Sequence, residues 1–83
     1  MENSNNEVMY QYQVGIYVKK KYGEGERKVS SHSYMKSSKK CRDEVEKDAN
    51  ERFAGDNICR VNCVAIRDKK FDRVIGYLDE GEW

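Results

Sequence analysis

The sequence is poor in several residue types that mark special structure or chemistry: its 83 residues include no proline, one histidine, one tryptophan and three cysteines. The absence of proline agrees with a small domain rich in strands, because proline cannot donate a hydrogen bond to a strand ladder. No apolar run approaches the ~20 residues that a bilayer-spanning helix needs, so we expect no membrane partner. Hydrophobic residues make up 37% of the chain and charged residues another 37%, which is enough apolar material for one small core only.

The cysteine count and the first residues indicate a cytoplasmic protein. Three is an odd number, and a secreted domain of this size would be expected to pair its cysteines. Residues 1–7 are polar and lack the basic start and the apolar stretch of a signal peptide. We therefore expect a cytoplasmic chain in which residues 1–7 form a disordered tail and residues 8–83 form a single domain.

The three cysteines are interpreted as buried free thiols. Cys59 and Cys63 are four residues apart in a predicted strand, which places them on one side of it and about 13 Å apart at ~3.3 Å per residue. That separation excludes a local disulfide, and the spacing is not that of a zinc knuckle. A metal site built from Cys41, Cys59, Cys63 and His32 is the alternative. A surface position for His32 is favoured over a catalytic or metal-binding role, because no nucleophile or second type of ligand lies near it in the sequence.

One helix is predicted over residues 36–55, and the rest of the chain is organised around it. Four apolar residues recur at a spacing of four, with charged or amide residues between them: Cys41, Val45, Ala49 and Phe53. This spacing is typical of an amphipathic helix with one narrow apolar stripe. Ser37 and Ser38 supply N-cap chemistry, and Gly55 is the usual left-handed residue that ends a helix.

Two stretches before the helix and two after it are predicted as strands: 8–18, 27–35, 58–67 and 71–78. In the first, apolar residues occupy the even positions, as in a central strand with one buried face. The third is apolar on both parities, as in a strand buried on both faces. We therefore predict an α+β fold, a single small ββαββ domain of antiparallel hairpins with one helix packed on one face of the sheet. The opposite face is expected to be solvated and polar, to form a homodimer, or to meet a partner.

Signatures of catalysis are missing from the sequence. It has no glycine-rich phosphate loop, no G-x-S-x-G nucleophile elbow, and no pair of histidines suited to metal ligation. A domain this small also has little room for a pocket that excludes water. We therefore predict a protein that is not an enzyme and that has no catalytic residues, no cofactor and no metal.

Charge is distributed unevenly along the chain, although the net charge is only +1. Residues 19–42 contain nine basic and two acidic residues, whereas residues 43–83 contain seven basic and eleven acidic residues. Such a separation informs about partners and not about fold. The predicted binding surface combines the basic segment with tyrosines that can stack beside cations, which suits unpaired bases or a protein interface. It consists of Lys19, Lys20, Lys21, Tyr22, Lys28, Tyr34, Lys36, Lys39, Lys40 and Arg42.

The start of the predicted helix carries the most specific signal. Lys36, Lys39 and Lys40 surround the two serines in and before the first turn, where positive charge opposes the helix dipole by ~0.5 kcal/mol per residue. Backbone amides, serine hydroxyls and lysines together make an anion site. We expect these lysines to contact nucleic-acid phosphates or an acidic protein surface. The alternative is that they simply extend into water, and a purely solubilising role is likewise open for the lysines of the first loop.

Residues 74–83 read VIGYLDEGEW, an ending that combines an aromatic residue, acidic residues, a glycine and a late tryptophan. Together with the small size and the order of elements over residues 10–83, this ending resembles small bacteriophage proteins with two hairpins around one helix, among them anti-CRISPR inhibitors of type I surveillance complexes. The resemblance implies a non-enzymatic protein that occupies a nucleic-acid-binding surface or a defence complex.

Two functional hypotheses follow. In the first, the chain is a phage-type inhibitor in the host cytoplasm that docks on a host protein or ribonucleoprotein complex through the basic, tyrosine-containing surface. In the second, it is a small RNA- or DNA-binding protein that contacts phosphates directly with the same residues. The sequence contains no RNP motif, no GXXG loop and no double-stranded-RNA-binding arrangement, so it matches no established RNA-binding module.

Overall fold

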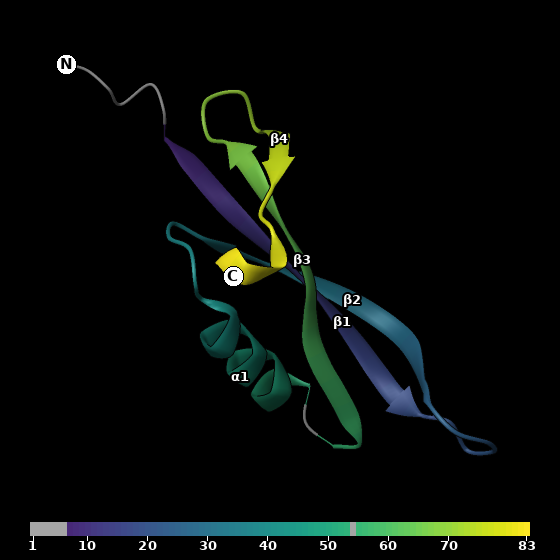
Figure 1. Ribbon diagram of the computed structural model, residues 1–83. Coiled ribbons are helices and arrows are strands. Elements are labelled where there is room, and N and C mark those ends of the chain that lie inside the picture. The colour runs from purple at the N-terminus through teal and green to yellow at the C-terminus, as the bar shows by residue number, and fades with distance from the viewer. Residues whose placement is uncertain (1–6, 54) are drawn as a thin grey trace.

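The computed structural model describes residues 7–53 and 55–83, which form a small domain of four strands and one helix (Figure 1). The elements in chain order are β1 (Val8–Lys19), β2 (Glu26–Lys36), α1 (Arg42–Arg52), β3 (Asn57–Asp68), β4 (Arg73–Tyr77) and a 3-10 turn, η2 (Glu80–Glu82). Neighbouring strands are antiparallel, in the order β2-β1-β3-β4. The predicted α+β domain of four antiparallel strands and one helix is confirmed, whereas η2 was not predicted. The tail predicted for residues 1–7 lies outside the described residues except for Glu7.

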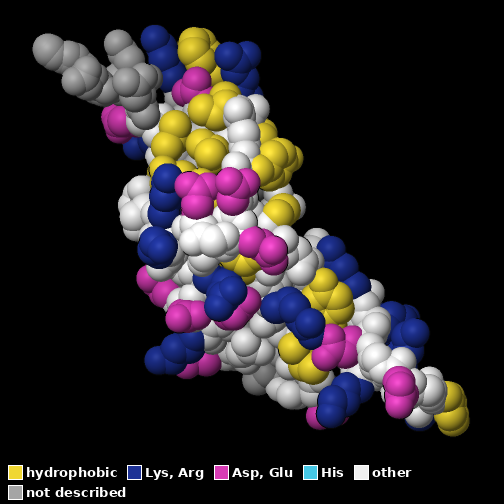
Figure 2. All heavy atoms as spheres, in the orientation of Figure 1, with side chains coloured by type: hydrophobic (Ala, Val, Ile, Leu, Met, Phe, Trp, Pro, Cys, Tyr) yellow, Lys and Arg dark blue, Asp and Glu magenta, His cyan; other side chains and the backbone are white. Residues whose placement is uncertain are grey.

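The domain is elongated, with extents of 58 × 22 × 21 Å along its principal axes. The loop between β1 and β2 lies at one end of the long axis, and the turn between β3 and β4 lies toward the other end (Figure 1). In the same orientation, side chains of both charge signs are intermixed over the region of α1 (Figure 2). Among the described residues, no helix is long and apolar enough to cross a membrane.

The core lies between α1 and the face of the sheet that α1 covers. Its buried side chains are Tyr12, Val14, Ile16, Val45, Ala49, Cys59, Val61, Val64 and Leu78. The members from β1 are alternate residues, because successive side chains of a strand point to opposite faces. The two members from α1 are four residues apart and therefore share one helix face. Cys41 and Phe53, the outer positions of the same stripe, pack partly buried against this core, so the predicted apolar stripe is confirmed.

A β-bulge in β3 changes which of its side chains share a face. The register of β3 against β1 skips Asn62, which has no partner on β1. One extra residue shifts the alternation by one position. Cys59 therefore faces α1 while Cys63 faces the other way, and the prediction that both lie on one side of the strand is wrong. The same shift explains the apolar residues on both parities, because Val61 before the bulge and Val64 after it both belong to the core under α1.

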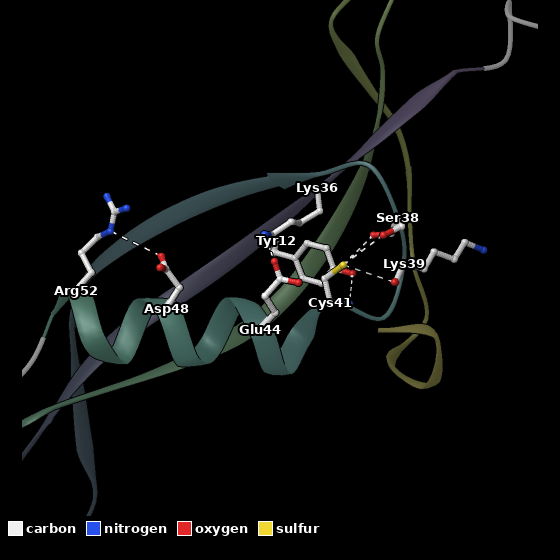
Figure 3. Close-up of polar contacts among 8 residues, drawn as sticks. All are labelled: Tyr12, Lys36, Ser38, Lys39, Cys41, Glu44, Asp48 and Arg52. Atoms are coloured by element: carbon white, nitrogen blue, oxygen red, sulfur yellow. Dashed lines mark hydrogen bonds and ion pairs between the residues drawn. The ribbon is translucent and has the colours of Figure 1, made fainter.

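The helix begins later than predicted. β2 continues to Lys36, which still pairs with β1, so Ser37 and Ser38 lie in a bend between β2 and α1 and are not N-cap residues. The cap position is occupied by Cys41, which forms no side-chain cap. The backbone N–H of Cys41 instead donates to the hydroxyl oxygen of Tyr12 over 3.0 Å (Figure 3). A fully buried tyrosine of the central strand β1 thus fixes the position of the helix start.

Two side chains of α1 close the outer edge of β3. Because β4 pairs only with residues 65–68 of β3, the first half of that edge has no neighbouring strand. Asn50 donates from Nδ2 to the carbonyl oxygen of Cys59 and accepts from the N–H of Cys59, over 3.3 and 3.2 Å. The N–H of Val61 donates to Glu46 Oε2 over 2.8 Å. Exposed backbone edges favour pairing with other chains, and here the helix supplies the missing partners.

The face of the sheet opposite α1 carries a polar network beside exposed apolar side chains such as Met35 and Tyr77. Gln11 donates from Nε2 to the hydroxyl of Ser33 over 3.2 Å, and its Oε1 accepts from Nη1 of Arg67 over 3.3 Å. These side chains come from three neighbouring strands, so the hydrogen bonds run across the sheet.

Candidate binding surface

The predicted basic residues fall into two groups at different places. The first group, which we call the cationic hairpin, lies at the loop end of β1 and β2 and also contains Arg27, which was not predicted: Lys19, Lys20, Lys21, Tyr22, Arg27 and Lys28. The second group, the helix-start corner, follows β2 at its other end: Lys36, Lys39, Lys40 and Arg42. Eight residue steps along β2 separate Lys28 from Lys36, or ~26 Å at ~3.3 Å per residue. The single continuous patch expected from the sequence is therefore divided.

The cationic hairpin is exposed throughout (residues 19–28). Tyr22 is 85% exposed at the loop, the highest value among the exposed large hydrophobic side chains. The loop is closed by a hydrogen bond from the N–H of Lys20 to the carbonyl oxygen of Gly25, over 3.1 Å. Gly23 and Gly25 have φ values of +87° and +102°, in the left-handed region that glycine adopts without strain. The two glycines therefore form the tight loop that presents Tyr22 and the lysines to solvent.

The positive charge of the hairpin is largely uncompensated. Within the described part of the chain, none of its five cations forms an ion pair with a carboxylate. Of the two acidic residues nearby, Glu26 pairs with Arg60 of β3, which leaves Glu24 as the remaining local negative charge. Figure 2 shows Lys and Arg side chains gathered toward this end of the molecule. Charges of one sign this close together act jointly, since the screening length at physiological salt is about 8 Å.

An arginine–tyrosine stack continues the hairpin onto the uncovered face of the sheet. The guanidinium carbon of Arg60 lies 4.8 Å from the ring centroid of Tyr17. Tyr17 pairs in register with Lys28, so the two side chains are neighbours on one face. The hydroxyl of Tyr17 donates to Asn62 Oδ1 over 3.1 Å. A Cβ atom at Gly15 would lie 2.5 Å from Asn62 Nδ2 and 2.7 Å from the Tyr17 ring, so these two side chains occupy space that only glycine leaves open.

Sequence reasoning missed Arg60. Its position beside Tyr17 depends on the register of β3 against β1, and alternation alone does not give that register. One signal was available: Gly15 interrupts an otherwise regular strand, and a glycine inside a strand marks a bulge or a close approach of another group.

The cations of the helix-start corner are mostly engaged with carboxylates. Lys36 Nζ lies 2.5 Å from Glu44 Oε2 (Figure 3), and this hydrogen bond raises the pKa of Lys36. Lys39 Nζ lies 3.5 Å from Glu82 Oε2. The pKa of Glu82 is lowered, first by a hydrogen bond from the backbone of Asp79 and then by Lys39. The charge of this corner is thus partly neutralised within the molecule.

The helix start does not have the geometry predicted for an anion site. Lys36, Lys39 and Lys40 precede α1, so they do not lie in its first turn. That turn contains Asp43 and Glu44 instead, which complement the positive end of the helix dipole in the ordinary way. Arg42, the first residue of α1, lies 3.8 Å from the Asp43 carboxylate, measured from Nε to Oδ1. The predicted anion site is absent from the first turn because α1 begins at Arg42, later than the sequence predicted.

Tyr34 is separated from the other predicted binding residues. Its ring lies on the helix-covered face, packed against the core and at 5.1 Å from the ring of His32, centroid to centroid. The guanidinium carbon of Arg52 lies 5.9 Å from the Tyr34 centroid. Burial raises the pKa of Tyr34. His32 also contacts the ring of Phe53, at 5.5 Å between centroids. The side chains of Tyr34 and His32 therefore serve packing in the described structure.

The alternative of a metal site has no geometric support among the described residues. No group of three or more His, Cys, Asp or Glu side chains there could hold a metal ion. Cys59 is buried, its thiol lies 3.6 Å from the carbonyl oxygen of Ala49, and burial raises its pKa. Cys63 faces the other side of the sheet and Cys41 lies at the helix start, so the three thiols do not converge.

The comparisons with known proteins give no family. No family model matches the chain, and no curated protein or solved structure matches it significantly.

Proposed function

We propose that this chain is a non-enzymatic binding protein that docks through the cationic hairpin on an acidic surface of a host protein or ribonucleoprotein complex. In this proposal it acts in the cytoplasm of the host cell, as an inhibitor of the kind that the resemblance to anti-defence proteins implies. The observation that carries the proposal is a projecting loop whose five cations have no carboxylate partners among the described residues, with Tyr22 exposed between them.

The physical support is a comparison of the two basic groups. Lys36 and Lys39 have carboxylate partners, so their charge already stabilises the folded chain. The hairpin cations contribute no such pairing, and like charges near one another repel. A potential of this kind steers an oppositely charged partner and raises its association rate. Tyrosine and arginine are the residues most often found at the energetic centre of interfaces, and the hairpin supplies Tyr22 and Arg27.

The perturbed side chains support a role other than catalysis. Shifted pKa values cluster at active sites when titratable groups share a cleft. Here burial raises the pKa values of two tyrosines and one thiol, Tyr12, Tyr34 and Cys59. The other two shifted groups are Lys36, which pairs with Glu44, and Glu82, which pairs with Lys39. Each shift has a structural cause, and no charged side chain is buried within the described residues.

One observation favours direct nucleic-acid binding as the second candidate. The Arg60–Tyr17 stack lies beside Lys28 on the uncovered face of the sheet, and bases stack on such aromatic and guanidinium planes. Five phosphate contacts would give a slope of about −3.5 for log K against log salt on a single strand. Titration of a labelled oligothymidylate at several salt concentrations measures this slope directly.

Capture from a bacterial lysate, with and without nuclease, tests the proposal. The variant K19Q/K20Q/K21Q removes three charges from the hairpin, and K36Q/K39Q/K40Q removes the same number from the helix-start corner as a matched control. We expect one protein complex to be recovered with the wild type and the control after nuclease, and to be lost with the hairpin variant. Equal recovery with all three chains would contradict the proposed site. Loss of every partner after nuclease would favour the nucleic-acid candidate instead.

A further inference from the structure

The strand β4 presents an open apolar edge. It is the outer strand of the sheet, and nothing among the described residues pairs with its outer side. Four large apolar side chains in or just before it are exposed: Phe71 (63%), Val74 (40%), Ile75 (52%) and Tyr77 (62%). Figure 2 shows hydrophobic side chains gathered at the end of the molecule where Figure 1 places β4. No charged residue lies between Arg73 and Asp79, although charge is a common protection of an exposed edge. The register of β4 against β3 skips Ile75, so the strand is bulged there, and residues on either side of the bulge remain available for pairing.

The other strand edges of the sheet are protected. β2 carries Glu26, Arg27, Lys28 and Lys36, and the first half of the outer edge of β3 is closed by the side chains of Asn50 and Glu46 from α1. The contrast singles out β4 as the one edge in the described structure that is both open and apolar.

The charges around β4 are arranged in a self-complementary way. Lys70 and Arg73 lie at its start, and Asp79 and Glu80 follow its end. Asp72 also lies at the start, but its carboxylate is already paired with Arg67 over 3.2 Å. Antiparallel pairing of two copies brings the basic start of each strand beside the acidic end of the other, whereas parallel pairing brings like charges together. Within the described chain none of these four residues forms an ion pair. The two cations instead lie 5.5 Å from the ring centroid of Phe71.

We propose that two copies of this chain associate through β4, as an antiparallel pair about a twofold axis that joins their sheets into one of eight strands. Backbone hydrogen bonds between the two edges give affinity, and the exposed apolar side chains and the complementary ends give register. β4 has five residues, so the interface is of the small class that associates weakly and reversibly. The cationic hairpins lie away from β4 and point in opposite directions in the pair, so this association is independent of the proposed function.

Sedimentation equilibrium over a range of concentrations tests the association. We expect the average mass to rise from 9.8 kDa toward twice that value as the concentration increases from about 1 μM to about 1 mM, the range expected for weak interfaces. Ile75→Lys places a charge on the edge at a side chain that is already 52% exposed, and it should weaken the dimer at least ~10-fold. Val29→Lys on the β2 edge, 45% exposed in the wild type, is the matched control and should leave the dimer unchanged.

A charge-reversal experiment tests the antiparallel arrangement. The variant K70E/R73E makes both ends of β4 acidic, and D79K/E80K makes both ends basic. Each variant should be monomeric alone because like charges meet, and an equimolar mixture should form a mixed dimer. A mass of 9.8 kDa for the wild type at every concentration would overturn the proposal and leave this edge to a different protein. A dimer that survives Ile75→Lys, or a mixture that stays monomeric, would also overturn it. Circular dichroism of each variant establishes that it is folded.

Discussion

Replacing Tyr12 with phenylalanine isolates the contact that fixes the helix start. The substitution removes one oxygen atom and keeps the ring, which is fully buried in the core. That oxygen accepts the N–H of Cys41 over 3.0 Å. A buried N–H left without a partner costs about 1–3 kcal/mol. Because Cys41 is only half-buried, water can partly replace the hydroxyl, and we expect the free energy of unfolding to fall by about 1–2 kcal/mol, as for the loss of a helix cap.

The matched control is Tyr10→Phe. Tyr10 lies on the same face of β1 and packs partly buried against the same core, but its hydroxyl forms no hydrogen bond among the described residues. Urea denaturation followed by circular dichroism gives the free energy of unfolding of both variants. Amide hydrogen exchange at Cys41 should be roughly 5- to 30-fold faster in Tyr12→Phe, the factor that corresponds to about 1–2 kcal/mol. Equal stability of the two variants, or unchanged exchange at Cys41, would refute this account of the helix start.

Three further predictions concern pH, packing and thiol reactivity. Burial raises the pKa of Tyr12 above its ordinary value of 10.0. The contribution of Tyr12 to stability is therefore complete below pH 10 and declines as the pH rises further. Above pH 10, the free energy of unfolding should decline less in Tyr12→Phe than in the wild type. Gly15→Ala should displace the side chains of Asn62 and Tyr17, which a Cβ atom there would approach to 2.5 and 2.7 Å, and cost about 1–2 kcal/mol in denaturation experiments. A background with both Tyr17→Ala and Asn62→Ala should remove most of that cost. Cys63 should react with a thiol reagent faster than Cys59 in the folded protein, because Cys59 is buried and its pKa is raised by that burial, whereas Cys63 is only half-buried. Equal rates would contradict the bulge in β3.

Most of the fold could be predicted from local patterns. Apolar residues at even positions placed β1 within one residue of its end, and the four-residue spacing of Val45 and Ala49 identified the buried face of α1. Gly55 has a left-handed φ of +115° as predicted, although α1 ends earlier, at Arg52, with Phe53 as its C-cap. These features depend on neighbours in the sequence, which is why the sequence is sufficient for them.

The remaining features depend on pairing between distant segments. The bulge at Asn62 exists only in the register of β3 against β1, and it placed Cys63 on the face opposite to the one predicted. The helix start moved because Lys36 extends the ladder with β1 instead of entering a helix. The same long strand divided the predicted binding surface.

Burial separates the two tyrosines that were predicted to lie on the binding surface. Tyr34 and Tyr22 are equally plausible stacking residues in the sequence. The structure packs Tyr34 against the core, whereas it exposes Tyr22 at the loop. Which face a polar edge strand turns toward the helix is set by its partner strand, and the sequence of β2 alone does not contain that information.

Site-specific crosslinking tests whether the chain docks on a protein partner through the cationic hairpin. A photoreactive phenylalanine analogue in place of Tyr22 probes the cationic hairpin, and the same analogue in place of Lys47 probes the exposed side of α1. Illumination in a bacterial lysate should join the chain to one protein partner from position 22 and to none from position 47. A crosslink from position 47 alone would contradict docking through the cationic hairpin, and a crosslink from position 22 that nuclease removes would identify nucleic acid as the partner.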